Sequence, residues 1–330
     1  MTTYDLVGIG NAIVDVISQA DDSVLDIMGI EKGIMQLIEQ DRGELLYAAM
    51  TNRVQTPGGS VANTVAGAGA LGLRAAFIGR VHDDALGRFY ADAIQKDGID
   101  FVNPPVPGGE LPTSRSMIFV SPDGERSMNT YLGISAELSS KDVPETATQK
   151  ARFLFLEGYL FDKDKGKEAF LVATRACHAD GGKTGIAVSD PFCVDRHRAD
   201  FLALIEHEMD YVIGNESEIC ALFETDDVDA ALAKTADICS LVVCTRSGNG
   251  VTVMNDSTRI DVPVDQATVV DATGAGDQFA AGFLYGLATE RDLETCARIG
   301  NACASEVISH IGPRPQADMQ VLLRTAGLLD

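Results

Sequence analysis

The residues best suited to chemistry lie in segment 271–277, which reads DATGAGD. Apolar residues follow at helical spacing, so a glycine-rich turn is predicted to open a helix with one apolar face. The free N–H groups of a helix N-terminus bind anions, and glycines let a phosphate approach the main chain. A carboxylate in that first turn, Asp277, suits a base that accepts the proton of an attacking hydroxyl during phosphoryl transfer. The alternative is a capped helix after a tight turn, in which Asp277 only favours the helix dipole.

This segment closely resembles the C-terminal signature of the ribokinase-like (PfkB) family of sugar and nucleoside kinases. The resemblance implies that Asp277 is the catalytic base. It also implies that the backbone of Gly274, Ala275 and Gly276 forms an anion hole for the transferred phosphoryl group. ATP would be the phosphoryl donor and Mg²⁺ its metal, while dependence on a monovalent cation such as K⁺ stays open.

A second glycine-containing motif is suited to recognising the phosphate acceptor. Gly58 and Gly59 leave backbone N–H groups open to a ligand, and Asn63 offers a donor and an acceptor on the following helix. The motif resembles the family's N-terminal di-glycine motif, which contacts acceptor hydroxyls. Asn11 and Asp15 resemble the family's early asparagine and its aspartate that binds vicinal hydroxyls, because one carboxylate accepts from both hydroxyls of a ribose diol. The alternatives are a glycine turn before an alanine-rich helix and an aspartate that caps a turn.

Asn215 and Glu218 follow a predicted strand and match the family's Asn-x-x-Glu motif, which organises magnesium and its waters near the phosphates. Carboxylate and amide oxygens suit hard Mg²⁺, often through water. The same spacing is also a capping box that would open a helix over 216–223. Both interpretations hold if they use different atoms, and Glu218 is the predicted metal residue.

Further positions resemble the nucleotide side of the family's site. The strand and turn over 243–250 resembles the segment that borders ATP, and it contributes Thr245, Ser247 and Gly250, although glycine usually occupies the position of Ser247. Asn301 matches a helix position near the adenine. Polar turns and asparagines within helices are also common structural features.

Arg126 follows the turn of a predicted hairpin and matches an arginine that reaches the phosphates from the lid in adenosine-kinase-like members. A guanidinium fits phosphate oxygens, and a lid residue engages only when the lid is closed. The alternative is a solvated arginine on an exposed hairpin.

The acceptor motifs favour a nucleoside over ribose. Ribokinases usually carry a lysine after the two glycines, where this chain has Ser60. The motifs together look more like the adenosine-kinase branch, in which an aromatic residue at the place of Tyr159 packs on the nucleobase. A core tyrosine is the alternative at that position.

Composition excludes several classes of protein. The chain has 330 residues with 49 acidic and 26 basic side chains, and its net charge of −23 disfavours nucleic acid or an anionic membrane as a partner. The seven cysteines form no C-x-x-C pair, so buried free thiols are expected. A signal peptide is not recognised and no apolar run is long enough to span a bilayer, so a cytoplasmic protein is predicted.

Helix and strand alternate along most of the chain. Strands are predicted over 4–9, 74–79, 152–157, 184–189, 210–213, 240–245 and 251–254, and helices over 61–71, 84–97, 165–179, 196–207, 216–223, 228–235, 276–289, 292–309 and 316–326. This alternation predicts an α/β fold of the ribokinase-like type, a three-layer α/β/α domain around a mainly parallel sheet. Ligands bind such sheets at the carboxyl ends of the strands, where the motifs fall.

Two segments interrupt the alternation. Short strands over 13–18 and 33–38, and a hairpin around a Pro-Asp-Gly turn at 122–124, predict a small β-sheet lid. The expected large kinase domain therefore comprises 1–12, 43–110 and 134–330, and the expected lid comprises 13–42 and 111–133.

These observations predict an ATP-dependent kinase that phosphorylates the 5′-hydroxyl of a ribonucleoside, with adenosine as the expected acceptor. The first alternative is a kinase of the same family for a sugar or sugar phosphate. The second is a non-catalytic sensor that binds nucleosides or nucleotides. The partners are expected to be small molecules, with the protein a monomer or a homodimer formed through the lid.

Overall fold

The computed structural model describes residues 4–109 and 111–329, which form two β-sheets. The large sheet has nine strands in the order β14-β13-β12-β11-β10-β9-β1-β5-β6. In chain order its strands are β1 (Tyr4–Ile9), β5 (Ala75–Ile78), β6 (Asp100–Phe101), β9 (Ala151–Glu157), β10 (Lys183–Ala187), β11 (Tyr211–Asn215), β12 (Leu241–Thr245), β13 (Val251–Asn255) and β14 (Thr258–Val262). Neighbouring strands from β6 to β12 are parallel, and β13 and β14 add an antiparallel edge.

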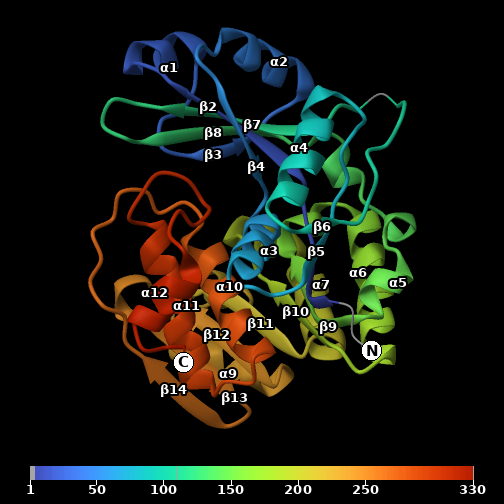
Figure 1. The fold of residues 1–330 in the computed structure, drawn as a ribbon, viewed down its shortest axis with the longest axis vertical. Helices are drawn as coiled ribbons and strands as arrows, with labels where there is room; N and C mark the ends of the chain where they lie inside the picture. The colour runs from blue at the N-terminus through green and yellow to red at the C-terminus, as the bar shows by residue number, and fades with distance from the viewer. Residues whose placement is uncertain (1–3, 110, 330) are drawn as a thin grey trace.

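Helices cover both faces of the large sheet (Figure 1) because its strands are apolar on both sides. One apolar cluster packs α3 (Ser60–Ala70), α4 (Ala85–Lys96), α10 (Ala275–Ala288) and α11 (Leu293–Val307) on one face. A second cluster packs α6 (Asp164–Ala179), α7 (Pro191–Glu208), α8 (Glu216–Ala221) and α9 (Val228–Ile238) on the other. Two shorter helices are α5 (Glu145–Thr148) and α12 (Met319–Thr325). The expected α/β fold with a mainly parallel sheet is confirmed.

The small sheet has five strands in the order β3-β8-β7-β2-β4 and lies at the top of Figure 1. These strands are β2 (Ile13–Gln19), β3 (Met35–Leu37), β4 (Val54–Gly58), β7 (Ser114–Val120) and β8 (Arg126–Tyr131). The helices α1 (Asp22–Met28) and α2 (Gln40–Ala49) accompany this sheet. The second sheet expected from the hairpin is therefore present.

The pairing of β4 differs from the expected division of the chain. Residues 54–58 were expected in the large domain, but β4 pairs antiparallel with β2 in the small sheet. The boundary expected at residue 42 also falls within α2. Pro57 and Gly58 read as a turn in the sequence, and proline is tolerated here because β4 is an edge strand. We therefore propose that the lid comprises residues 13–58 and 111–133.

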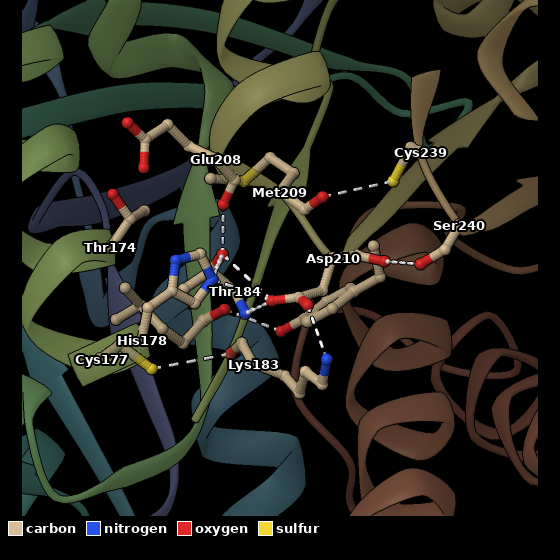
Figure 2. Close-up of polar contacts among 12 residues, drawn as sticks. Thr174, Cys177, His178, Lys183, Thr184, Glu208, Met209, Asp210, Cys239 and Ser240 are labelled. Carbon is tan, nitrogen blue, oxygen red and sulfur yellow. Dashed lines mark hydrogen bonds and ion pairs between the residues drawn. The ribbon is translucent and has the colours of Figure 1, made fainter. Parts of the chain in front are cut away.

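A polar cluster ties the amino ends of β10 and β11 to α6 (Figure 2). The Asp210 carboxylate contacts His178 Nε2 at 3.0 Å and accepts from Lys183 Nζ at 2.8 Å and Thr184 N at 2.8 Å. Thr184 Oγ1 also contacts His178 Nε2, at 2.9 Å. Because both partners reach the same imidazole nitrogen, this Thr-His-Asp group lacks the geometry of a catalytic relay. The cluster joins β10 and β11 at their amino ends, on the opposite side of the sheet from the carboxyl ends of the strands.

Across the described residues, no helix combines the length and the apolar character that crossing a bilayer requires.

Candidate active site

A cavity of about 880 Å³ lies between the small sheet and the carboxyl ends of the central strands of the large sheet. It brings together side chains that are far apart in the sequence. The predicted site residues that line it are Asn11, Asp15, Gly59, Asn63, Tyr159, Asn215, Glu218, Thr245, Gly276 and Asp277. The predicted residues outside this lining set are Gly58, Arg126, Ser247, Gly250, Gly274, Ala275 and Asn301.

Asp277 lies in the first turn of α10, where two side chains from α3 hold its carboxylate. Ser60 Oγ donates to Oδ1 at 2.7 Å, and Asn63 Nδ2 donates to Oδ2 at 3.0 Å. Burial raises the pKa of Asp277 to about 6, while these two hydrogen bonds and the charge of Arg314 lower it. The two hydrogen bonds thus fix the orientation of the carboxylate, and a pKa of about 6 suits a group that accepts protons near neutral pH.

The turn before α10 is shaped by two glycines, one that caps the helix and one that faces the cavity. Gly274 caps the helix with φ +80°, and a Cβ built there would lie 2.6 Å from the Cα of Pro313, so only glycine fits. A Cβ on Gly276 would meet no atom within 4 Å, because this residue faces the cavity. The Asp271 carboxylate accepts from Thr273 N at 3.0 Å and Gly312 N at 2.9 Å, which holds the turn in place.

Asp15 occupies the middle of β2 and faces the cavity from the lid. Burial raises its pKa to about 6, and the charges of Arg126 and Arg314 oppose that rise. Gly58 lies on the paired strand β4, where a Cβ would come within 2.5 Å of the Asp15 carboxylate. The glycine is therefore required by the close approach of Asp15, a reason that is independent of ligand binding.

Glu157, at the end of β9, is a site residue that the sequence interpretation missed. Its carboxylate is buried and accepts from Asn11 N at 3.1 Å, Asn11 Nδ2 at 2.7 Å and Val61 N at 3.0 Å. Burial raises its pKa to about 7 against the effect of these bonds. The available signal was a lone acidic residue at the end of the apolar run 153–156, a place where an unpaired charge is costly. Glu157 holds the Asn11 and di-glycine segments together.

Asn215 and Glu218 form the capping box at the start of α8 that the spacing allowed. Asn215 Oδ1 accepts from Glu218 N at 2.9 Å, and Glu218 Oε2 accepts from Asn215 N at 3.0 Å. Burial raises the pKa of Glu218 to about 7, and its side chain faces the cavity. Asn215 Nδ2 also donates to Glu218 Oε1 at 2.7 Å, so Asn215 contacts both oxygens of this buried carboxylate. Carboxylate oxygens suit a hard divalent metal, often through water. No cluster of three or more metal-ligating side chains occurs among residues 4–109 and 111–329, so phosphate and water oxygens would complete such a site.

The predicted nucleotide residues are divided between the cavity and its surroundings. Thr245 lines the cavity at the end of β12. Ser247 has φ +49°, which explains the preference for glycine at its position. Gly250 closes the same turn at φ +86°, and a Cβ there would lie 2.1 Å from the carbonyl oxygen of Val262. Asn301 on α11 donates from Nδ2 to the carbonyl oxygen of Pro263 at 3.2 Å, so it supports the loop after β14.

Arg126 extends from β8 to the loop that leads into the anion site, where it forms an ion pair with Asp271. Both side chains are nearly buried, with 9% and 7% of their surfaces exposed. Arg126 Nε and Nη2 are buried and have no hydrogen-bond partner among the described residues. Hydrogen bonds from Thr273 and Gly312 and the Arg126 charge hold the pKa of Asp271 below its usual range, although burial acts in the opposite direction.

Two aromatic side chains border the cavity on the α7 side. Tyr159 lies on a short 3₁₀ helix over Gly158–Asp162, and burial raises the pKa of its hydroxyl. Phe192, at the start of α7, is 73% exposed and was not identified from the sequence. An exposed phenylalanine next to a cavity offers an apolar face to a ligand.

Comparison with known proteins places this geometry in a family. Residues 26–319 match the family described as pfkB family carbohydrate kinase. The crystal structure of adenosine kinase from Sinorhizobium meliloti is 46% identical, with a TM-score of 0.90 over 98% of this chain and 99% of that one. A probable sugar kinase from Rhizobium etli is 42% identical, with a TM-score of 0.92 over the whole of both chains. The 5-dehydro-2-deoxygluconokinase of Bacillus subtilis is 26% identical across 88% of this chain and 91% of its own.

The family match spans most of the chain, and the matched region contains the turn before α10, the di-glycine segment and most of the residues that line the cavity. The family implies ATP and a small-molecule acceptor as the substrates. This chain therefore belongs to the pfkB family and is a phosphotransferase of the kinase type.

Proposed function

We propose that the protein transfers the γ-phosphoryl group of ATP to the 5′-hydroxyl of a ribonucleoside, and that the nucleoside is adenosine. The similarity to the Sinorhizobium meliloti adenosine kinase supports this choice. The observation that carries it is the arrangement of polar and apolar side chains on the cavity face of the lid.

The strand register places these lid side chains in two adjacent rows. In the first row Asp15 lies opposite Ser116 on β7, which lies opposite Thr130 on β8 and shares a 2.8 Å hydrogen bond with it. In the next row Met128 lies opposite Met35 on β3. All five side chains line the cavity. Leu37 on β3 lies opposite Thr130 and also lines the cavity, so the polar row ends beside an apolar group formed by Leu37, Met35 and Met128. Polar side chains beside an apolar group match a nucleoside, whose ribose bears hydroxyls and whose base is a flat, largely apolar ring.

The cavity offers little to an acidic acceptor. Among the described lining residues the basic side chain is Arg196, and Asp162 already holds it through Nη2 at 2.9 and 3.0 Å. A sugar acid would therefore meet the carboxylates of Asp15 and Glu157 without an unpaired cation on the cavity wall. The neutral nucleoside avoids this cost.

In the proposed reaction Asp15 accepts hydrogen bonds from the two ribose hydroxyls and orients the 5′-hydroxyl toward Asp277. Asp277, ionised at neutral pH, accepts the proton of that hydroxyl as its oxygen attacks the γ-phosphorus. The N–H groups at the start of α10 stabilise the negative charge that develops on the transferred group. Glu218 would hold Mg²⁺ through water, and the metal would neutralise charge on the phosphates.

A sugar kinase is the second candidate, because the Rhizobium etli probable sugar kinase covers the whole chain at 42% identity. A bare sugar would occupy the polar row and leave Met35 and Met128 without a partner. The third candidate, a non-catalytic sensor, would bind nucleosides without releasing ADP.

A coupled ADP-release assay distinguishes these candidates. Purified protein is incubated with ATP and Mg²⁺, and separately with EDTA, against adenosine, other ribonucleosides, ribose, fructose and 5-dehydro-2-deoxygluconate. Adenosine is expected to give the highest kcat/KM, with loss of turnover in EDTA. Preference for a sugar would overturn the nucleoside assignment, and binding of adenosine without ADP release would favour the sensor.

A further inference from the structure

The loop that follows α11 contacts the catalytic turn through two consecutive residues. The backbone N–H of Gly312 donates to the Asp271 carboxylate at 2.9 Å. Pro313 packs directly against Gly274, and its carbonyl oxygen accepts from Gln278 Nε2 at 3.0 Å. The position of this loop is therefore fixed relative to α10, and so is the position of the next residue.

That next residue, Arg314, connects this loop to α3 and α4. Its Nε donates to Asn63 Oδ1 at 3.4 Å, and its Nη1 forms an ion pair with Asp97 at the end of α4. Its side chain is 18% exposed, and Nη2 is buried without a hydrogen-bond partner among the described residues. Pro313 lines the cavity, whereas Arg314 lies outside the lining set. Arg314 therefore stands behind the site rather than in it.

Its contact with Asn63 determines which way the amide of that side chain points. An amide has one oxygen, which accepts, and one nitrogen, which donates. With Oδ1 engaged by Arg314 Nε, Nδ2 is directed to Asp277 Oδ2 at 3.0 Å. A rotated amide would place its oxygen against the carboxylate, where the two would repel each other.

We propose that Arg314 is a positioning residue for phosphoryl transfer: its guanidinium fixes the Asn63 amide so that Nδ2 donates to Asp277, and it supplies a positive charge beside that carboxylate. This inference rests on the role proposed above for Asp277 as the base. It adds a residue outside the cavity that keeps the base oriented and ionised.

The surroundings of Asp277 are otherwise acidic. Titratable groups from the lid, β9, the 158–162 turn, α8 and the loop after α11 interact with it electrostatically, and these are Asp15, Glu157, Tyr159, Glu218 and Arg314. Arg314 is the cation of this set and lowers the pKa of Asp277. Without its charge and with a free Asn63 amide, the pKa of Asp277 should rise, so a smaller fraction of the base is ionised below neutral pH.

The test is the pH profile of kcat/KM for adenosine in the wild type, Arg314→Gln and Arg314→Lys. It is measured from about pH 5.5 to about pH 9 with saturating ATP. Arg314→Gln should move the acidic limb to higher pH, so that the loss of kcat/KM is at least about threefold larger at pH 6 than at pH 8.5. Arg314→Lys keeps the charge, so its acidic limb should lie closer to the pH of the wild-type limb than that of Arg314→Gln does. The KM for ATP, measured separately with saturating adenosine, should be the same in both variants as in the wild type.

Two controls separate this role from a structural one. Asp97→Asn removes the ion pair of Arg314 but keeps its charge and its contact with Asn63. Arg80→Gln removes another partly buried arginine–aspartate pair, formed with Asp142. Both are expected to lower the melting temperature, but neither should move the acidic limb to higher pH.

The outcomes distinguish the inference from the proposed function. If Arg314→Gln is active with an unmoved acidic limb, or if Asp97→Asn moves the limb equally, the role of Arg314 is wrong and Asp277 remains the proposed base. If the wild type shows no turnover with any acceptor, the proposed function fails first.

Discussion

Arg126 on lid strand β8 is ion-paired with Asp271, which lies in the loop before the helix that carries Asp277. The pair is nearly buried and connects the lid to the large domain. Two guanidinium nitrogens of Arg126 have no partner among the residues that the structure describes, so the side chain retains donors for a phosphate. The lid thus reaches the turn that is proposed to bind the transferred group.

Replacing Arg126 should impair phosphoryl transfer more than acceptor binding. Arg126→Gln is expected to reduce kcat by roughly tenfold or more, because a cation that stabilises developing phosphate charge is lost. The KM for adenosine should change little. Steady-state kinetics of ADP release measures both constants.

The matched control for this variant is Arg115→Gln. Arg115 is another lid arginine, but it lies over the ring of Tyr47. Its replacement should leave kcat close to that of the wild type. Equal kcat values for the wild type and Arg126→Gln would remove Arg126 from the mechanism.

Replacing Asp277 should separate binding from chemistry. Asp277→Asn nearly preserves shape but removes the base, so kcat is expected to fall by about 10²- to 10⁴-fold. Adenosine binding, measured by isothermal titration calorimetry, should stay within a few-fold of the wild type. Asp292→Asn, at the exposed N-cap of α11, is the matched control and should keep full activity. Undiminished turnover in Asp277→Asn would contradict its assignment as the base.

The site carboxylates should make the ligand-free protein less stable as the pH rises from about 4.5 to about 7. Burial raises the pKa values of Asp15 and Asp277 to about 6 and those of Glu157 and Glu218 to about 7. In this window the unfolded chain has released protons that the folded protein still holds, so the free energy of unfolding decreases with pH. Urea denaturation across this range measures the slope.

A single substitution tests the origin of that slope. Glu157→Gln removes one of the four titrating groups, so the decrease between about pH 4.5 and about pH 7 should be smaller, whatever the variant's stability at one pH. Glu294→Gln, an exposed residue in the first turn of α11, should leave the slope unchanged. A stability that rises with pH through this window would contradict the assignment.

The cluster in Figure 2 should matter for stability and not for catalysis. Asp210→Asn weakens contacts to Lys183, Thr184 and His178, so the free energy of unfolding at neutral pH is expected to fall by about 1–2 kcal/mol. Burial acts to raise the pKa of Asp210. The contacts with Lys183, Thr184 and His178 outweigh burial and hold this pKa below its usual range.

Because the folded pKa of Asp210 is lowered, its contribution exists above the unfolded value and disappears as the pH falls. The stability difference between wild type and Asp210→Asn should therefore shrink below about pH 4. Asp237→Asn, an exposed substitution on α9, is the control. A large loss of kcat/KM at neutral pH in folded Asp210→Asn would show that the cluster affects the active site.

Some expectations failed for reasons that particular segments illustrate. The strand over 54–58 was missed because Pro57 and Gly58 indicate a turn, and only pairing with β2 makes this segment a strand. The helix over 40–49 contains Gly43 and lacks a strong apolar periodicity, so its packing on the small sheet stabilises it more than its own sequence does. The strand over 258–262 is mostly exposed at the edge of the large sheet, which leaves it without an apolar pattern.

Features that depend on neighbouring residues could be predicted from the amino-acid sequence. The glycine turn before Asp277, the capping box of Asn215 and Glu218, and the alternation of helix and strand all follow from spacings of a few residues, over which backbone geometry is nearly fixed. These features were enough to predict the fold and the family.

The contacts between distant residues depend on how the folded chain packs. Asn63 and Asp277 are 214 positions apart, Asn11 and Glu157 are 146 apart, and Arg314 reaches Asn63 across 251. Strand order and helix packing set such contacts, and one sequence carries no local signal for them. Burial then raises the pKa values of these carboxylates, because it depends on everything packed around them.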